Sequence, residues 1–222
     1  MPLLLPVLLL LPASPAYYPP EVSSCTTDIP APLVVLGPRS AETDVPLNTS
    51  LWLSLRGDPT KLVVALYDDA QLAIPLQVEV LYTRGGFAAV RARPERDLRP
   101  RSRYTLEWRL GEANGGHLFD TGAMRDDQAP DVPRVQSAAG YDASFCGAGV
   151  ELGVLIFPPD LGVMHEGSVN GAVAGLNRDL ELVLHVGEPG LDVVGAVVAI
   201  DLAGNRSSSA GYQTTTPTLE EV

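Results

Sequence analysis

The sequence predicts an all-β protein with two tandem antiparallel β-sandwiches that follow a cleaved leader peptide. Short stretches of alternating apolar and polar residues, turn-forming clusters between these stretches, and the lack of a long run with helical periodicity all support this prediction. Without the leader, a chain of 222 residues is long enough for two sandwiches of about 100 residues, each with its own core.

The clearest predicted strand of the first half runs from Leu51 to Leu55. Leu51, Leu53 and Leu55 fall on one side of an extended chain, and Trp52 and Ser54 fall on the other. Turn residues precede this strand, and the same alternation recurs in three later stretches, at residues 76–80, 90–93 and 104–110. Short strands of this kind, separated by Gly, Pro, Asp and Asn, indicate an antiparallel sandwich.

A local motif precedes the last of these stretches. Leu98, Pro100 and Tyr104 occur with the spacing of a tyrosine corner, in which a tyrosine hydroxyl bonds to backbone a few residues upstream. Such corners are typical of immunoglobulin-like and fibronectin-like sandwiches. The alternative is that Tyr104 is simply the first core aromatic residue of its strand.

The chain contains three separated motifs: TDVPLNTSLWLSL, LRPRSRYTLEW and FDTGAMRDDQAP. Together they resemble the bacterial Ig-like module of S-layer and other envelope proteins, and the match covers about residues 32–130. The sequence departs from that module at 39–42, where its turn usually contains Gly, and at 56–59, where Phe-Ser-x-Pro is customary. The resemblance implies an extracytoplasmic Ig-like sandwich with a structural or adhesive role.

The second half repeats the strand pattern less clearly. Alternating runs occur at residues 150–156 and 180–186, and 193–201 is nearly all apolar. The following Leu-Ala-Gly-Asn-Arg-Ser resembles the end of bacterial Ig-like and fibronectin type III modules. We therefore predict the following segments: a signal peptide (1–16), an N-terminal extension (17–31), a first sandwich (32–127), a second sandwich (128–207) and a disordered tail (208–222) rich in Ser, Thr and Pro.

The acidic linker at residues 126–133 is expected to be a solvated hinge. Asp126, Asp127 and Asp131 lie in this linker, whereas Asp201 and Asn205 close the last predicted strand. Antiparallel topology is expected to keep these two groups apart, so no calcium site is predicted between them.

Export is predicted from the N-terminus. An apolar run at 3–11 is too short to span a bilayer, and Ser14 and Ala16 fit the small-residue positions of a signal peptidase site. The expected location is secreted, periplasmic or on the cell surface, with no transmembrane segment. Val22-Ser23-Ser24-Cys25 also fits a lipoprotein processing site, which would make Cys25 the lipidated first residue.

Cys25 and Cys146 are the two cysteines of the chain. In an oxidising compartment they could pair, which would require the N-terminal segment to fold back or the sandwiches to pack side by side. Whether they pair is left open by the sequence.

Charge is unevenly distributed. Residues 128–222 hold 3 basic and 12 acidic residues, so nucleic acid is a poor partner. The first half contains a basic cluster that could bind an anionic polysaccharide or a lipopolysaccharide phosphate: Arg91, Arg93, Arg99, Arg101 and Arg103. The alternative is a solvated strand face whose charges pair locally.

No catalytic motif or metal-ligand spacing is present in the sequence. We therefore expect a non-enzymatic structural or adhesive binding protein, without a cofactor, whose partner is an envelope protein or a polysaccharide. One alternative is a carbohydrate-binding module with Trp52 as its stacking platform. Another is a small metal-dependent hydrolase or accessory protein that uses His165, Glu166 and His185, with Cys146 as a further zinc ligand.

Overall fold

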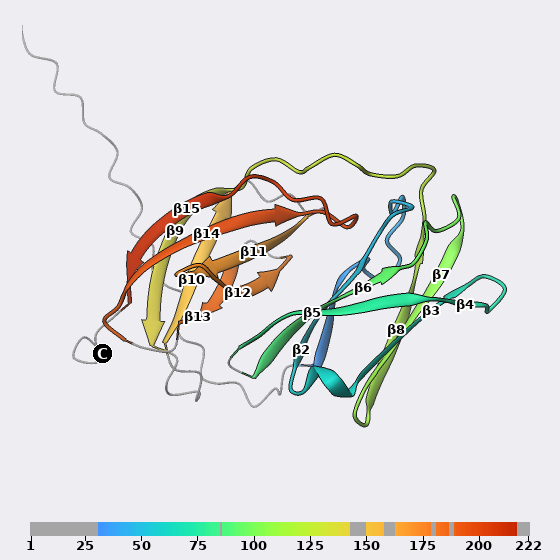
Figure 1. Ribbon diagram of the computed structural model, residues 1–222, viewed down its shortest axis with the longest axis horizontal. Helices are drawn as coiled ribbons and strands as arrows, with labels where there is room; N and C mark the ends of the chain where they lie inside the picture. The colour runs from blue at the N-terminus through green and yellow to red at the C-terminus, as the bar shows by residue number, and fades with distance from the viewer. Residues whose placement is uncertain are drawn as a thin grey trace, which may run out of the picture.

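The computed structural model describes residues 31–84, 86–142, 150–157, 163–178, 181–186 and 189–216. Within these residues the chain forms two antiparallel β-sandwiches that lie side by side (Figure 1). This agrees with the all-β, tandem-sandwich fold predicted from the sequence.

The first sandwich pairs two four-stranded sheets. The first sheet has the order β1-β2-β6-β5, from strands Leu33–Gly37, Leu51–Arg56, Phe87–Pro94 and Leu76–Arg84. The second has the order β4-β3-β7-β8, from strands Ala73–Ile74, Leu62–Asp68, Arg103–Leu110 and Ala113–Asp120. A 3-10 turn, Pro59–Lys61, connects β2 to β3. This is the ABED/CFG strand order of immunoglobulin-like sandwiches, with one additional short strand.

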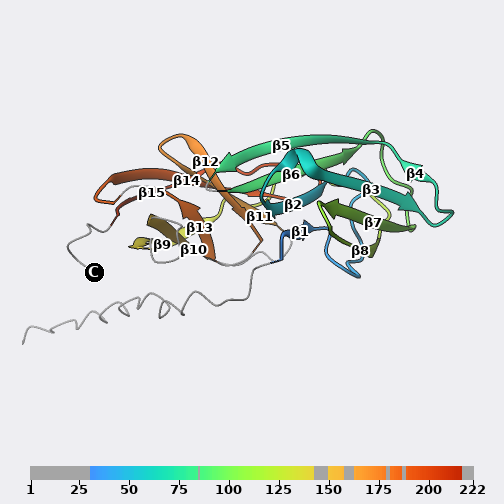
Figure 2. The same cartoon turned by 90° about the horizontal axis from the view of Figure 1, so that it is seen from below.

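The second sandwich pairs a three-stranded sheet with a four-stranded sheet. The first has the order β13-β10-β9, from strands Glu181–His185, Val150–Phe157 and Arg134–Asp142. The second has the order β12-β11-β14-β15, from strands Ala172–Asn177, Met164–Val169, Asp192–Ile200 and Ala210–Thr215. In Figure 2, a view turned by 90° from that of Figure 1, β12 of the second sandwich lies beside β5 of the first.

The predicted disordered tail is wrong where it overlaps β15. Ala210–Thr215 pairs with β14 from Val197↔Ala210 to Asp192↔Thr215. Tyr212 is buried in the core, and the Thr216 N–H donates to the Leu191 carbonyl. The Ser and Thr content suggested disorder, but threonine favours strands, and one buried tyrosine is enough to fix the inward face.

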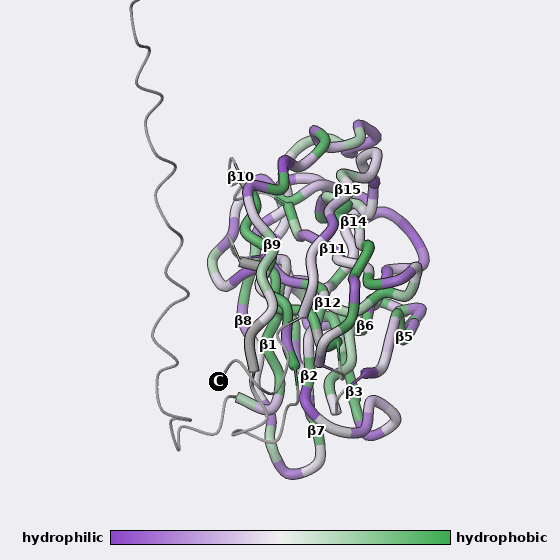
Figure 3. Tube along the Cα trace, turned by 90° about the vertical axis from the view of Figure 1, so that its left-hand side faces the viewer, coloured by the Kyte–Doolittle hydropathy of each residue, from purple (hydrophilic) through white to green (hydrophobic). Residues whose placement is uncertain are grey.

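The core of the first sandwich continues into the second. Met164, Leu176, Ile200 and Leu202 belong to the same buried cluster as the first sandwich's leucines. The second sandwich has a separate core that includes Leu152, Leu182 and Val197. The hydropathy trace shows green apolar stretches in both halves (Figure 3). Because one buried cluster contains residues of both sandwiches, the two sandwiches bury apolar surface against each other.

Candidate functional site

We call the contact between the two sandwiches the joint, and Arg178 is its central charged residue. Arg178 follows β12 of the second sandwich, and its guanidinium reaches Glu42 of the first: Nη2 donates to Oε1 at 2.6 Å and Nη1 to Oε2 at 3.0 Å. Nη1 also donates to the Leu36 carbonyl at 3.1 Å. The side chain of Arg178 is only 4% exposed, so its charge depends on these partners rather than on water.

Glu42 is held in its ionised form at the joint. Burial raises the pKa of its carboxyl, but hydrogen bonds from Arg178 and from the Arg39 N–H lower it more, so the pKa lies below its ordinary value. Carboxylates that accept such charge-assisted bonds are stabilised as anions.

One carbonyl group of the second sandwich accepts hydrogen bonds from three groups near the start of β2. The Leu202 oxygen accepts from the Ser50 N–H at 2.7 Å, from Thr49 Oγ1 at 3.3 Å and from Trp52 Nε1 at 3.3 Å. The Leu202 side chain packs against Gly37 so closely that a Cβ there would overlap Leu202 Cδ2. The joint is thus closed by polar and apolar contacts together.

Trp52 is covered by this contact. It lies on the outer face of β2, as the alternation predicts, yet it is 1% exposed. The Arg91 guanidinium lies 5.6 Å from the centre of its ring. Trp52 is therefore no exposed platform for a sugar, which corrects that version of the carbohydrate-binding alternative.

The linker is hydrogen-bonded to both sandwiches at Asp126, contrary to the predicted solvated hinge. Asn205 Nδ2 donates to the Asp126 carbonyl at 2.9 Å, and Asn48 Nδ2 donates to the same oxygen at 2.8 Å. The expectation that Asp126 and the turn at Asp201 and Asn205 would stay apart is also wrong. The sandwiches lie side by side, so the turn after β14 returns to the junction.

The Asp201 carboxylate accepts hydrogen bonds from the turn that follows it. Burial raises the pKa of its carboxyl, against hydrogen bonds from Asn205 that lower it. Its Oδ1 accepts from the Gly204 and Asn205 N–H groups, and Oδ2 accepts from Asn205 Nδ2. The carboxylate closes the turn that carries Leu202 and Asn205 into the joint.

The five predicted anion-binding arginines do not form one face. Arg91 and Arg93 lie in β6, on the outer face of the β1-β2-β6-β5 sheet, and Arg91 pairs with Glu79 at 2.6 Å. Arg103 lies on the other sheet and forms a two-pronged pair with Asp120, at 2.8 and 3.0 Å. Arg99 lies 3.8 Å from Asp68. The side chains of Arg93 and Arg101 form no ion pair with any residue that the structure describes.

Tyr104 makes the backward contact of a tyrosine corner. At the start of β7, its hydroxyl accepts from the Arg99 N–H at 2.7 Å, and its ring stacks on Phe119 at 5.7 Å between centroids. Leu98 is buried beside it, and the exposed Pro100 offers its carbonyl to the Ser102 hydroxyl. Burial raises the pKa of the Tyr104 hydroxyl.

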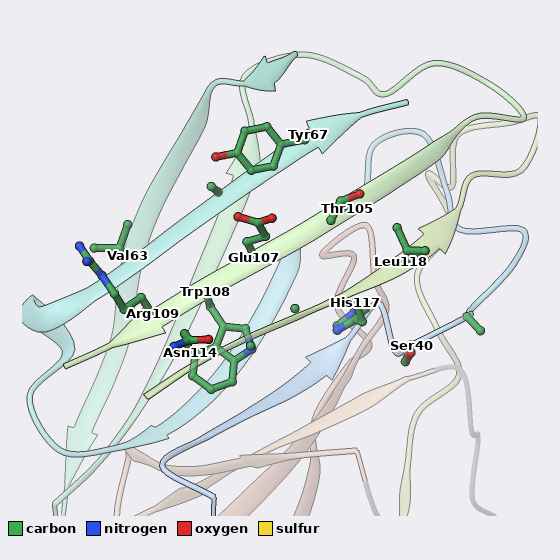
Figure 4. A pocket seen from close by; sticks show the side chains of 14 residues that line it. Ser40, Val63, Tyr67, Thr105, Glu107, Trp108, Arg109, Asn114, His117 and Leu118 are labelled. Atoms are coloured by element: carbon green, nitrogen blue, oxygen red, sulfur yellow. The ribbon is translucent and has the colours of Figure 1, made fainter. Parts of the chain in front are cut away.

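An open groove of about 1010 Å³ runs over the β3-β7-β8 sheet. Figure 4 shows Tyr67, Thr105, Glu107 and Arg109 on the outer face of this sheet. The Trp108 ring extends toward β8. Val63 and Leu118 contribute exposed apolar surface. His117 is engaged with the Pro38 carbonyl at 2.7 Å. The groove therefore combines exposed apolar, aromatic and charged groups.

The residues of the enzyme alternative are not assembled into a site. His165 is buried on β11, and Glu166 next to it pairs with Arg206. His185 ends β13, which belongs to the other sheet. In the ranges that the structure describes, no group of three or more His, Cys, Asp or Glu residues is placed to hold a metal ion.

Several features predicted from the sequence fall outside the described residues. These are the signal peptide, both cysteines and the lipoprotein processing site. Among the described residues, no helix is long and apolar enough to cross a membrane.

No protein-family model matches the chain, and no curated protein matches its sequence. Solved structures similar to it include the N-terminal Ig1-2 module of Drosophila receptor protein tyrosine phosphatase DLAR. That module is 13% identical, with 82% of this chain and 97% of that one covered and a TM-score of 0.29. The fibronectin(III)-like modules of Clostridium thermocellum CbhA are 10% identical, with 83% and 94% covered and a TM-score of 0.30.

At such identities and TM-scores these neighbours say nothing about function. The class of the protein follows from the strand order and register described above: a tandem of immunoglobulin-like or fibronectin-like β-sandwiches.

The joint was missed at the sequence level. Arg178 and Glu42 are 136 positions apart, and neither belongs to an alternating run. The available signal was Arg178 itself, one of three basic residues in the second half.

Proposed function

We propose that this protein is a non-enzymatic structural or adhesive binding protein, secreted or associated with a bacterial cell envelope. The observation that carries the proposal is the joint. A buried ion pair, a carbonyl with three donors and a shared apolar cluster fix one sandwich against the other. Two modules held in this way form a stiff unit, which suits a spacer or a presenting scaffold.

The groove over β3, β7 and β8 is the binding face in this proposal. Its exposed Val63 and Leu118 lie among Glu107 and Arg109, and a mixture of apolar and charged groups is typical of protein interfaces. An envelope protein or a polysaccharide is the proposed partner. Arg91 and Arg103 of the predicted anion-binding set pair with Glu79 and Asp120, so that set is a weaker candidate for this role.

Rotational diffusion tests the stiff-unit part of the proposal. The ¹⁵N relaxation of the two sandwiches should give one common correlation time in the wild-type protein. In Gly37→Leu, which places a side chain where Leu202 packs, the two sandwiches should give separate and shorter times. Different correlation times in the wild-type protein would contradict the proposal.

The binding part has a separate test. Cell fractionation with cross-linking should recover the protein in the exported or envelope fraction, attached to a partner. Glu107→Lys combined with Arg109→Glu should reduce that cross-linking, and the matched pair Gln136→Lys with Arg134→Glu on β9 should not. Recovery in the cytoplasm alone would refute the envelope role.

A further inference from the structure

Among the described residues, no partner pairs with the outward backbone groups along the first half of β8. The chain's own segment after β1 covers the second half: the Ala41 N–H donates to the Leu118 carbonyl at 2.8 Å, and the Asp120 N–H donates to the Glu42 carbonyl at 2.9 Å. Leu118 and Asp120 therefore direct their backbone groups away from β7.

The period of two in a strand gives Asn114 and Gly116 the same orientation, because β8 pairs with β7 without a bulge. In the part of the chain that the structure describes, no hydrogen bond satisfies the N–H or C=O groups of Asn114 and Gly116. Four backbone groups are thus available to an added strand.

This half of the edge is unprotected. Edge strands are usually shielded by charged side chains, proline or a bulge, and Ala113–His117 has none of the three. Gly115 and Gly116 leave the backbone bare, and the Trp108 ring lies against Gly115, where a Cβ would be 2.7 Å from its Cζ2. Glycines in a strand often mark the close approach of another backbone.

The described chain begins at the end of the sandwich where this free half begins. The Pro32 carbonyl accepts from the Arg56 N–H at 2.9 Å, which places the entry to β1 at the end of β2. A short 3-10 turn leads from there to Leu62, which pairs with Leu110, the residue opposite Ala113. The entry to β1 and the start of β8 are therefore at the same end of the sandwich.

We propose that residues 22–28 of this chain, Val-Ser-Ser-Cys-Thr-Thr-Asp, add to the free half of β8 as an antiparallel strand. The segment has no Gly or Pro and includes three β-branched residues, and prolines flank it at 19–20 and 30. Five free edge residues span about 16 Å at about 3.3 Å per residue, which seven residues can cover.

The direction of the chain at β1 supports residues 22–28 as the occupant of this edge. β1 and β8 both begin at the same end of the sandwich. A chain that descends along β8 and reverses at residues 29–32 would enter β1 with the observed direction. The segment that follows β1 already adds to the other half of this edge, in the parallel direction, so the chain's own backbone is accepted along β8.

Amide hydrogen exchange of the full chain tests the proposal. The Gly116 N–H should exchange at least tenfold more slowly in the wild type than in the double variant T26P/T27P, which removes two adjacent N–H groups from the added strand. The Gly115 N–H faces β7 and should not change. The matched control Y17P/Y18P places the same two prolines outside the segment and should keep the wild-type exchange rate at Gly116.

Each other outcome overturns the proposal. Rapid exchange at Gly116 in the wild type means that the edge is open. Slow exchange in both the wild type and T26P/T27P means another occupant: a second copy of the chain if dilution removes the protection, and another segment if it does not.

Discussion

Arg178 of the second sandwich and Glu42 of the first form a two-pronged ion pair in which the arginine is almost fully buried. Breaking a buried pair from one side leaves an uncompensated charge, whereas replacing both partners by apolar residues removes the cost of desolvation. The stability of the joint should therefore depend on the partners being changed together.

The first prediction concerns this pair. Glu42→Ala should lower the free energy of unfolding by about 3 kcal/mol, because the buried charge of Arg178 loses its carboxylate partner. The double variant Glu42→Leu with Arg178→Met should lose less than the single variant. Urea denaturation measures both, and Asp120→Ala, which breaks the exposed pair with Arg103, should cost less than about 1 kcal/mol. Additive losses in the double variant would contradict the argument.

The second prediction is a pH dependence. The pKa of Glu42 is lower in the folded protein than its ordinary value of 4.5, since its bonds to Arg178 and Arg39 outweigh the effect of burial. The resulting stabilisation is present above the unfolded pKa and is lost as pH falls through the folded one. The urea midpoints of wild type and Glu42→Gln should differ most at pH 6 and converge toward pH 3. A constant difference would show that Glu42 does not titrate in this way.

The third prediction concerns the corner. Tyr104→Phe should cost about 1 to 3 kcal/mol, because the Arg99 N–H loses its acceptor. Tyr67→Phe is the matched control, since the Tyr67 hydroxyl borders the open groove and makes no hydrogen bond to any described residue. Equal denaturant midpoints for Tyr104→Phe and the wild type would mean that only the ring matters.

The fourth prediction uses two glycines of the second sandwich. A Cβ at Gly195 would overlap the Tyr212 ring and the Ser168 carbonyl, and the Tyr212 hydroxyl is fixed by donating to that carbonyl at 2.8 Å. Gly195→Ala should therefore cost about 1 to 3 kcal/mol or more. Gly211→Ala, whose Cβ would meet its nearest atom at 3.9 Å, should stay within about 0.5 kcal/mol of wild type in thermal unfolding.

The fifth prediction concerns calcium. Asp201 already accepts three hydrogen bonds from its own turn. Calcium at millimolar concentration should therefore leave the melting temperature equal to that in chelator. Binding at 100 times the dissociation constant would add about 2.7 kcal/mol, so an increase of several degrees that disappears in Asp201→Asn would refute this prediction.

Local alternation was enough to predict the strands that have one buried face. Leu51, Leu53 and Leu55 on β2, and Leu152, Val154 and Ile156 on β10, are all buried where the period of two places them. The same rule failed at the edges of sheets: Val78 and Val80 alternate on β5 but remain exposed. An edge strand has a neighbour on one side only, which its own sequence does not reveal.

The joint could not be predicted by such patterns. Trp52 has the position of an outward residue, yet it is buried and donates to the Leu202 carbonyl of the second sandwich. The hydrogen bonds that join Arg178 to Glu42 and Thr49 to the Leu202 carbonyl connect residues 136 and 153 positions apart. Contacts at that distance depend on how complete domains pack, and no local window contains the information.

That separation also has a kinetic consequence. Contacts between residues far apart in sequence require large loops to close, so they form slowly and late. Each sandwich should therefore fold before they dock, and a docking phase should follow in which Trp52 passes from water to a buried site. Until that phase ends, the exposed tryptophan and the apolar residues around Leu202 are a surface on which two unfinished chains could associate. Refolding yield should accordingly fall with protein concentration more steeply than the folding of either sandwich would suggest.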